Sequence, residues 1–369
     1  MLDAVLRALA VAGAMTWEIT WALVLGFALS AVVQAVVAKS TVVALLGDCR
    51  PRTLAVAAGL GVASSSCSYA AVALARSLFR KGADFTAAMA FEIASTNLVV
   101  ELGVILALLM GWQFTLAEFA GGFVMIVVVA VLFRVWLRPG LVRQARTQAE
   151  RGLAGSMEGH AAMDMSVGGR RLFSGEGFTA TAHVFVMEWA AILRDLVAGL
   201  LIAGAIAAWV PDSFWQVFFF SDDPLAAKLW GPVIGPLVAV MSFVCSIGNV
   251  PLAVVLWKSG ISFGGVIAFI FADLLILPIL HIYRKYYGLR MTLFLLGTFY
   301  LAAVVAGYAV EFLFGALGLI PDQAHARLPA EGITWNYTTW LNIVFLVLAG
   351  MLLVRFFRTG GLGMLRAMD

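Results

Sequence analysis

Long apolar stretches separated by short polar segments dominate the chain. Nine of them have roughly the 20 residues that a helix needs to cross a bilayer: 16–38, 53–79, 86–110, 113–137, 187–210, 229–257, 261–282, 290–314 and 336–357. The composition agrees, because 63% of the residues are hydrophobic and only 12% are charged, too few polar side chains to cover a soluble protein. We therefore predict an all-α, polytopic membrane protein with about 8–10 transmembrane helices in a lipid bilayer, and we exclude soluble enzymes.

One long segment interrupts this pattern. Residues 138–183 contain six arginines and many Gly, Ala and Ser residues, without a long apolar run. We interpret the segment as an Arg-rich cytoplasmic linker, because basic residues accumulate on the cytoplasmic side of membrane proteins. The chain then divides into a first membrane half at 1–137, the linker at 138–183 and a second membrane half at 184–369. The net charge of +3 is too small to indicate a nucleic-acid partner.

The same charge rule conflicts with a simple count of the spans. Counting from the linker places several basic residues on the outer face: Arg284, Lys285, Arg290, Arg355, Arg358 and Arg366. We favour a re-entrant segment among those interrupted by Gly and Pro, since irregular backbone at membrane depth is tolerated where it lines a cavity. The alternative is that a segment such as Phe214–Phe220 also enters the membrane.

An internal repeat links the two halves. Residues 64–95 align without a gap with residues 242–273, at an offset of 178. Identical positions include Ser64/Ser242, Cys67/Cys245, Ser68/Ser246, Gly82/Gly260 and Phe85/Phe263. Related units of this kind are typical of secondary transporters, whose substrate sites lie where the repeats meet. We therefore expect two related halves with broken or re-entrant helices at the repeat interface. The repeat also fits the ancestry of a stable fold, with shared small residues as packing contacts.

The second copy carries a polar stripe. Ser242, Cys245, Ser246 and Asn249 are spaced i, i+3, i+4 and i+7, so on one helix they share a face. Pro251 removes the amide hydrogen that would bond the carbonyl of Ile247, and with Gly248 it predicts a broken helix. We assign substrate binding to residues of both copies: Cys67, Ser68, Cys245, Ser246, Asn249 and Pro251.

Two cysteines at equivalent positions suit a soft ligand. Thiolates bind trivalent arsenicals and thiophilic metal ions, so Cys67 and Cys245 at a repeat interface predict such a substrate. The alternative is structural, because cysteine is a favoured small buried residue and neighbouring hydroxyls bond their own helix carbonyls. The spacing leaves both interpretations open. Participation also stays open for Cys49 and for the linker residues His160, Met163 and Met165.

Acidic residues inside the predicted spans are candidates for proton coupling. Asp273 lies near the middle of the span 261–282, and Glu92 lies in the corresponding stretch of the first copy. A carboxyl group at membrane depth is costly as an anion and carries a proton as an acid. We predict Asp273 as the main and Glu92 as the second proton-coupling residue, with Glu101 a weaker candidate. The alternative for Asp273 is a protonated acid that bonds a neighbouring helix.

Several enzyme signatures are absent from the sequence. The chain has no GxxxxGK[ST] loop for ATP, no HExxH zinc helix and no second acidic cluster to complement Asp222 and Asp223. We therefore expect no enzymatic activity, no cofactor and no resident metal ion.

The chain resembles the ArsP/YraQ-type permease family in the run CSIGNVPLAVVLWKSGISFGGVIAFIFADLLILPILHIYRKYYG at 245–288. The first copy is similar to this family through CSYAAVALARSLFRKGADF and FEIASTNLVVELG, as is EGHAAMDM in the linker. The resemblance implies an efflux permease of the inner (plasma) membrane that exports trivalent organoarsenicals such as methylarsenite. It further implies that Cys67 and Cys245 meet the arsenical and that proton exchange supplies the energy. The first copy departs from the second in having Ala70 and Ala73 where Gly248 and Pro251 stand, which weakens a symmetric site with two broken helices.

These observations predict a proton-coupled exporter of methylarsenite or a related soft species, bound between the two CS-containing helices. Two alternatives stay open. A permease for an unrelated small solute would use the Ser and Asn groups in place of thiols. A non-transporting subunit would assemble with a partner through its Gly faces, Gly231 with Gly235 and Gly260 with Gly264. Assembly into a homo-oligomer also stays open.

Overall fold

The computed structural model describes residues 2–36, 45–64, 68–80, 82–150, 174–209, 218–219, 223–242, 246–322, 335 and 337–362. Within these ranges every regular element is a helix, which confirms the all-α class. Four segments are long and apolar enough to cross a membrane, namely Phe85–Leu109, Trp112–Trp136, Leu289–Ala316 and Thr339–Arg358. The bent pair Phe263–Leu275 and Ile279–Tyr287 is a fifth when taken as one span. The protein is therefore a multi-pass membrane protein.

The first half of the described chain contains α1 (Leu2–Val36), α3 (Pro51–Ser64), α4 (Ser68–Arg80), α5 (Phe85–Asn97), α6 (Val100–Leu109) and α7 (Trp112–Trp136). The predicted linker contributes α8 (Pro139–Glu150). The second half contains α10 (Gly175–Trp209), α12 (Pro224–Ser242), α13 (Ser246–Lys258), α14 (Phe263–Phe271), the 3₁₀-helix η1 (Ala272–Leu275), α15 (Leu277–Tyr287), α16 (Leu289–Ala316) and α17 (Tyr337–Arg358). Helix α10 thus begins inside the segment that we predicted as linker.

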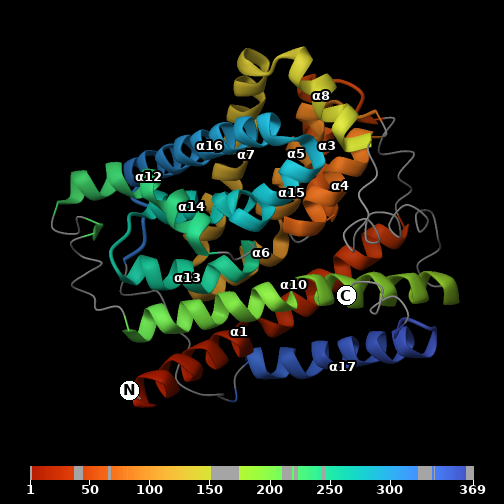
Figure 1. Ribbon diagram of the computed structural model, residues 1–369. Coiled ribbons are helices and arrows are strands. Elements are labelled where there is room, and N and C mark those ends of the chain that lie inside the picture. Colours follow the sequence, from red (N-terminus) through yellow and green to blue (C-terminus); the bar gives the residue numbers. More distant parts are fainter. Residues whose placement is uncertain are drawn as a thin grey trace.

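The long helices α1, α10 and α17 form a layer beside the helices of the repeat (Figure 1). Polar contacts fix α17 on α1, because the indole N–H of Trp17 donates to the hydroxyl of Thr339 at 3.2 Å. The side-chain amide of Asn342 also donates to the carbonyl of Trp17 at 2.7 Å. The repeat helices consequently form a compact group of their own, in which the candidate site lies.

The helices that follow the glycine turns begin at equivalent positions in the two copies. Phe85 begins α5, and Phe263 begins α14 178 residues later. The turns match as well, because Gly82 and Gly260 have φ angles of 107° and 100°, a region that glycine adopts without steric strain. Asp84 and Ser262 then cap the following helices with their side-chain oxygens. Both copies therefore fold into the same helix, glycine turn and helix.

Two predicted spans, 53–79 and 229–257, are wrong as single crossings. Each is a pair of shorter helices, α3 with α4 and α12 with α13. The amide of Asp84, just after α4, donates to the carbonyl of Leu46, just before α3, at 2.8 Å. Similarly, Ala227 near the start of α12 and Gly260 just after α13 line one pocket. Both ends of each pair thus lie at one membrane face, and each pair is re-entrant. A helix of 13 residues such as α4 or α13 is only about 20 Å long, too short to cross a core of roughly 30 Å.

The helix break predicted at Gly248 and Pro251 is also wrong. Helix α13 runs continuously through both residues, since a proline near the start of a helix removes a single backbone hydrogen bond. The breaks lie in the second helix of each copy. The first separates α5 from α6 at Leu98 and Val99, and the second comprises η1 and Ile276, whose backbone is extended.

Both breaks pack against the middle of α7, where the sequence has two consecutive glycines. A Cβ atom on Gly121 would lie 2.8 Å from the ring of Phe271 at the end of α14. A Cβ atom on Gly122 would overlap the side chain of Leu98 at the end of α5. The two glycines leave room for the side chains of Phe271 and Leu98 against α7. The interrupted backbone of both copies therefore meets α7 near the middle of the membrane.

The glycines that we considered as a partner-binding surface pack within the chain. A Cβ atom on Gly235 would overlap the carbonyl of Gly265 in α14, and one on Gly264 would overlap the carbonyl of Gly307 in α16. Gly231 likewise faces Ser262. Close helix packing inside the protein therefore accounts for these small residues.

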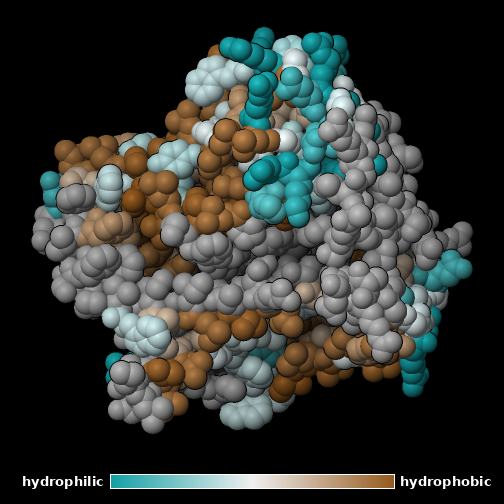
Figure 2. All heavy atoms as spheres, viewed as in Figure 1, coloured by the Kyte–Doolittle hydropathy of each residue, from teal (hydrophilic) through white to brown (hydrophobic). Residues whose placement is uncertain are grey.

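The basic residues of the second half adjoin the Arg-rich segment. The side-chain amide of Gln148 in α8 donates to the carbonyl of Lys285 at 3.2 Å. Arg355 in α17 donates to the hydroxyl of Thr179 at 3.0 Å and to the carbonyl of Gly175 at 3.2 Å, at the start of α10. Figure 2 shows a largely apolar described surface with a hydrophilic region around α8. One re-entrant pair in each half thus brings these cations to a common face, as the positive-inside rule requires.

Candidate functional site

Most of the predicted site residues that the structure describes are fully buried. Ser68, Glu92, Asn249 and Asp273 each have no exposed side-chain surface, and Pro251 is buried too. Cys67, Cys245, His160, Met163 and Met165 lie outside the described residues, as does the side chain of Ser246. Cys49 is exposed near the start of α3.

Ser68 and Asp273 form a direct hydrogen bond across the repeat interface. The hydroxyl of Ser68, the first residue of α4, donates to Oδ2 of Asp273 at 2.7 Å. Asp273 lies in η1, at the break in the second copy. The contact therefore joins a residue that we predicted for substrate binding to the residue that we predicted for proton coupling.

Glu92 makes a second contact between the copies. Its Oε1 accepts a short hydrogen bond from the hydroxyl of Tyr283 in α15, and both side chains are fully buried. We did not predict Tyr283 from the sequence, because a tyrosine in a basic, aromatic helix end resembles an interfacial anchor.

Glu118 on α7 is a third buried acid, and sequence reasoning missed it. The side chain is fully buried, and neither carboxyl oxygen has a hydrogen-bond partner among the residues that the structure describes. Glu92 on α5, Glu118 on α7 and Asp273 in η1 are thus three fully buried carboxyl groups, which we call the acidic cluster. The available signal was the one that identified Asp273, a lone acid within an apolar span.

The polar stripe of the second copy is not carried by one helix. Ser242 is the last residue of α12 and Ser246 is the first residue of α13. Ser64 and Ser68 are related in the same way to α3 and α4. The i, i+3, i+4 spacing therefore marks the connection within a re-entrant pair, which helical periodicity alone does not reveal.

Asn97 and Glu101 are separated by the break between α5 and α6. Asn97 is the last residue of α5 and is fully buried, and neither atom of its amide group has a partner among the described residues. Its backbone carbonyl faces Gly122, one helical turn from Glu118 on α7. Asn97 thus adds a further polar group to the region where the broken helices meet α7.

The buried cluster lies deep in the membrane. Ser68 and Arg80 are the two ends of α4, and Arg80 adjoins the turn at the membrane face. Twelve helical steps correspond to about 18 Å, roughly the distance from a membrane face to its middle. Among the described residues no group of three His, Cys, Asp or Glu side chains has the arrangement to hold a metal ion. The site is thus a buried set of hydroxyl, amide and carboxyl groups that offers hydrogen bonds and proton-binding positions.

The sequence matches the profile of the ArsP_1 family, described as "Predicted permease", over residues 4–312. The chain belongs to this permease family. The permease is also 71% identical over 338 residues to a protein of Mycobacterium tuberculosis named "Putative permease Rv2963", and the match covers 90% of this chain and 83% of that protein. No solved structure matches the permease. Its buried polar cluster lies within the family match and, as in other transporters built from repeats, where the two copies meet.

Proposed function

We propose that the permease is a proton-coupled exporter of trivalent organoarsenicals such as methylarsenite, in the inner membrane. The observation that carries this proposal is the hydrogen bond between Ser68 and Asp273. The bond supports the proposal because the hydroxyl is a group that can bind substrate and the acid is one that can bind a proton. We propose that the substrate and the proton bind at these adjacent groups and that each weakens the binding of the other. An exchanger of substrate for protons requires such coupling.

The acidic cluster supports proton coupling. Carboxylates in an apolar interior lack the solvation that water provides, and like charges repel one another. Both effects favour the protonated, neutral form of these acids, so the cluster is suited to binding protons. Glu92, Glu118 and Asp273 lie on three different segments, α5, α7 and η1. A change in their protonation therefore acts directly on the packing between the two copies.

The thiols supply the preference for a soft substrate. Cys67 and Cys245 are the residues that immediately precede Ser68 and Ser246 in the sequence. Sulfur ligands favour trivalent arsenic over hard cations. We propose that both thiols bind the arsenical, with Ser68, Ser246 and Asn249 as its polar surroundings and Pro251 shaping the re-entrant helix.

Methylarsenite resistance of arsenic-sensitive cells tests the proposal. We expect the wild-type chain and the Cys49→Ser variant to confer resistance, and the Cys67→Ser/Cys245→Ser variant to confer none. Cys49 is the matched control, because it is exposed and remote from the buried cluster. Full resistance in the double variant contradicts the thiol mechanism.

Flux into inside-out vesicles tests proton coupling separately. We expect wild-type vesicles to accumulate methylarsenite only when a pH gradient is imposed. Asp273→Asn and Glu118→Gln should abolish accumulation against the gradient while permitting downhill exchange. Uphill accumulation by Asp273→Asn contradicts the coupling role.

A permease for another small solute is the second candidate. The fully buried Asn249 and the Ser68 hydroxyl favour it, because both bind solutes without sulfur chemistry. In that case a thiol-blocking reagent leaves transport intact.

A further inference from the structure

The equivalent turns of the two copies lie at opposite ends of α7. Phe85, which begins α5 after the first turn, stacks on Phe133 near the end of α7, with ring centroids 5.9 Å apart. Phe263, which begins α14 after the second turn, packs on Phe114 near the start of α7, at 4.6 Å. Phe114 and Phe133 are separated by 19 helical steps, or about 28 Å.

The two turns also lie near opposite ends of α16, which runs antiparallel to α7. Phe133 packs on Phe294 near the start of α16 at 5.2 Å, whereas Phe263 packs on Phe314 near its end at 5.4 Å. The separation of the turns equals the thickness of a hydrocarbon core, about 30 Å. The two copies therefore have inverted topology, with one glycine turn at each membrane face.

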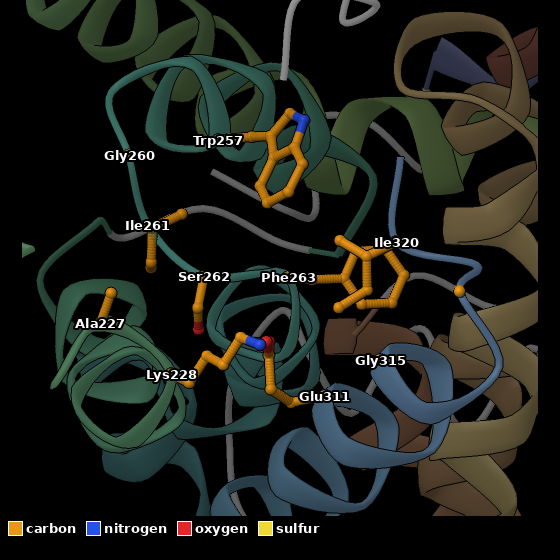
Figure 3. A pocket seen from close by; sticks show the side chains of 11 residues that line it. Ala227, Lys228, Trp257, Gly260, Ile261, Ser262, Phe263, Glu311, Gly315 and Ile320 are labelled. Atoms are coloured by element: carbon orange, nitrogen blue, oxygen red, sulfur yellow. The ribbon is translucent and has the colours of Figure 1, made fainter. Parts of the chain in front are cut away.

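A pocket of about 430 Å³ opens at the turn of the second copy. Apolar side chains, including Trp257, Ile261 and Phe263, form one wall (Figure 3). On the other side Lys228 points toward Glu311 (Figure 3). Oε2 of Glu311 also accepts a hydrogen bond from the amide of Gly264 at 2.6 Å, which anchors this carboxylate at the start of α14.

Arginine 146 of α8 fills the corresponding place in the first copy. At the offset of 178, Trp257 and Ile261 correspond to Phe79 and Ala83. The Arg146 guanidinium donates to the carbonyls of Phe79 and Ala83, at 2.6 Å and 3.0 Å, and lies 4.1 Å from the ring centroid of Phe79. Arg146 lies in α8, outside the aligned copies 64–95 and 242–273. The lack of symmetry between the two faces thus has a specific cause in α8.

We propose that the pocket is the outer vestibule of the transport path and that Arg146 closes its symmetry-related counterpart on the cytoplasmic face. The assignment of the faces follows from the basic residues gathered around α8. The site itself is closed in this structure, since Ser68, Asn249 and Asp273 have no exposed surface, and the pocket forms a vestibule at the outer face. Release of Arg146 from Phe79 and Ala83 opens the inner vestibule, as alternating access by inverted repeats requires. This inference rests on the proposed function only in describing the two places as parts of a transport path; the positions of the turns and of Arg146 do not depend on it.

Labelling with a membrane-impermeant maleimide tests the inverted topology. Cys49 lies just before α3 and Ala227 near the start of α12, so one thiol can be placed at the membrane-face end of either re-entrant pair. In a chain with Cys67→Ser and Cys245→Ser, we expect native Cys49 to react only in inside-out vesicles. The variant Cys49→Ala/Ala227→Cys should react only in right-side-out vesicles. Both positions are at least partly exposed, so neither substitution disturbs the core. Labelling of both positions from the same face overturns the inference.

The gate is tested with a thiol under Arg146. Ala83→Cys, in a chain without other cysteines, should react slowly in inside-out vesicles. Arg146→Ala should accelerate labelling by about a hundredfold or more, because two hydrogen bonds from a charged group are lost; Arg146→Gln is the more conservative second variant. The matched control is Arg143→Ala, since Arg143 is exposed on the same helix. Equal rates with Arg146→Ala and Arg143→Ala overturn the gate. If the labelling pattern is as expected but methylarsenite is not transported, the result supports the two vestibules and contradicts the proposed substrate.

Discussion

Replacing Ser68 with alanine removes the hydroxyl that donates to Asp273 across the repeat interface. The bond is 2.7 Å long and both side chains are fully buried, so water cannot replace the lost donor. A hydrogen bond to a neutral group contributes about 0.5–1.5 kcal/mol and one to a charged group about 1.5–3 kcal/mol. Buried hydrogen bonds in membrane proteins lie toward the lower end of these values. We therefore expect a coupling free energy of about 1–2 kcal/mol between the two side chains.

A double-mutant cycle measures this coupling. Ser68→Ala, Asp273→Leu and the double variant are unfolded with dodecyl sulfate in mixed micelles, and the free energies of unfolding are compared. Ser259→Ala with Asp273→Leu is the matched control, because the buried Ser259 hydroxyl bonds only the Val255 carbonyl of its own helix among the contacts described. We expect no coupling there. A coupling below about 0.5 kcal/mol for Ser68 and Asp273, the limit of ordinary additivity, refutes the structural role of this bond.

Two further substitutions probe the same region. Tyr283→Phe should destabilise the protein by about 1–2 kcal/mol because it leaves a Glu92 oxygen without its donor, whereas Tyr287→Phe should cost nothing, since the buried Tyr287 hydroxyl has no partner among the described residues. Equal unfolding free energies of the two variants contradict the Glu92 contact. Gly122→Leu should abolish folding or transport, because even a Cβ atom there overlaps Leu98. Wild-type expression and thermal stability of this variant contradict the close packing at the helix break.

Part of the fold follows from local sequence. The apolar stretches predict helices in a bilayer, and the offset of 178 predicts the equivalent starts of α5 and α14. The turns at Gly82 and Gly260 follow from the same alignment, because only glycine adopts their positive φ without strain. The periodicity does not show that 53–79 is divided in two, since a half-length helix and a full span have the same local pattern.

The candidate site follows from the sequence only in part. Asp273, Glu92 and Ser68 are recognisable as costly polar groups in apolar segments. Their pairing is not, because Ser68 and Asp273 are 205 positions apart and meet only when the inverted copies pack together. Tyr283 was not singled out from the sequence, and only the packing of α15 puts its hydroxyl beside Glu92.

The sequence by itself determined that the protein lies in a bilayer and which polar residues are costly to bury, because both depend on composition along the chain. It also determined the duplication, which depends on identical residues at a constant offset. The tertiary structure alone decided which apolar segments cross the bilayer and which return, since that depends on where the ends of α3 and α4, or α12 and α13, come to lie. It also decided that Glu118 on α7 is as fully buried as Asp273 and Glu92. A buried polar group is costly unless it forms a hydrogen bond, and the partner that forms this bond is decided by the packing of segments far apart in the sequence.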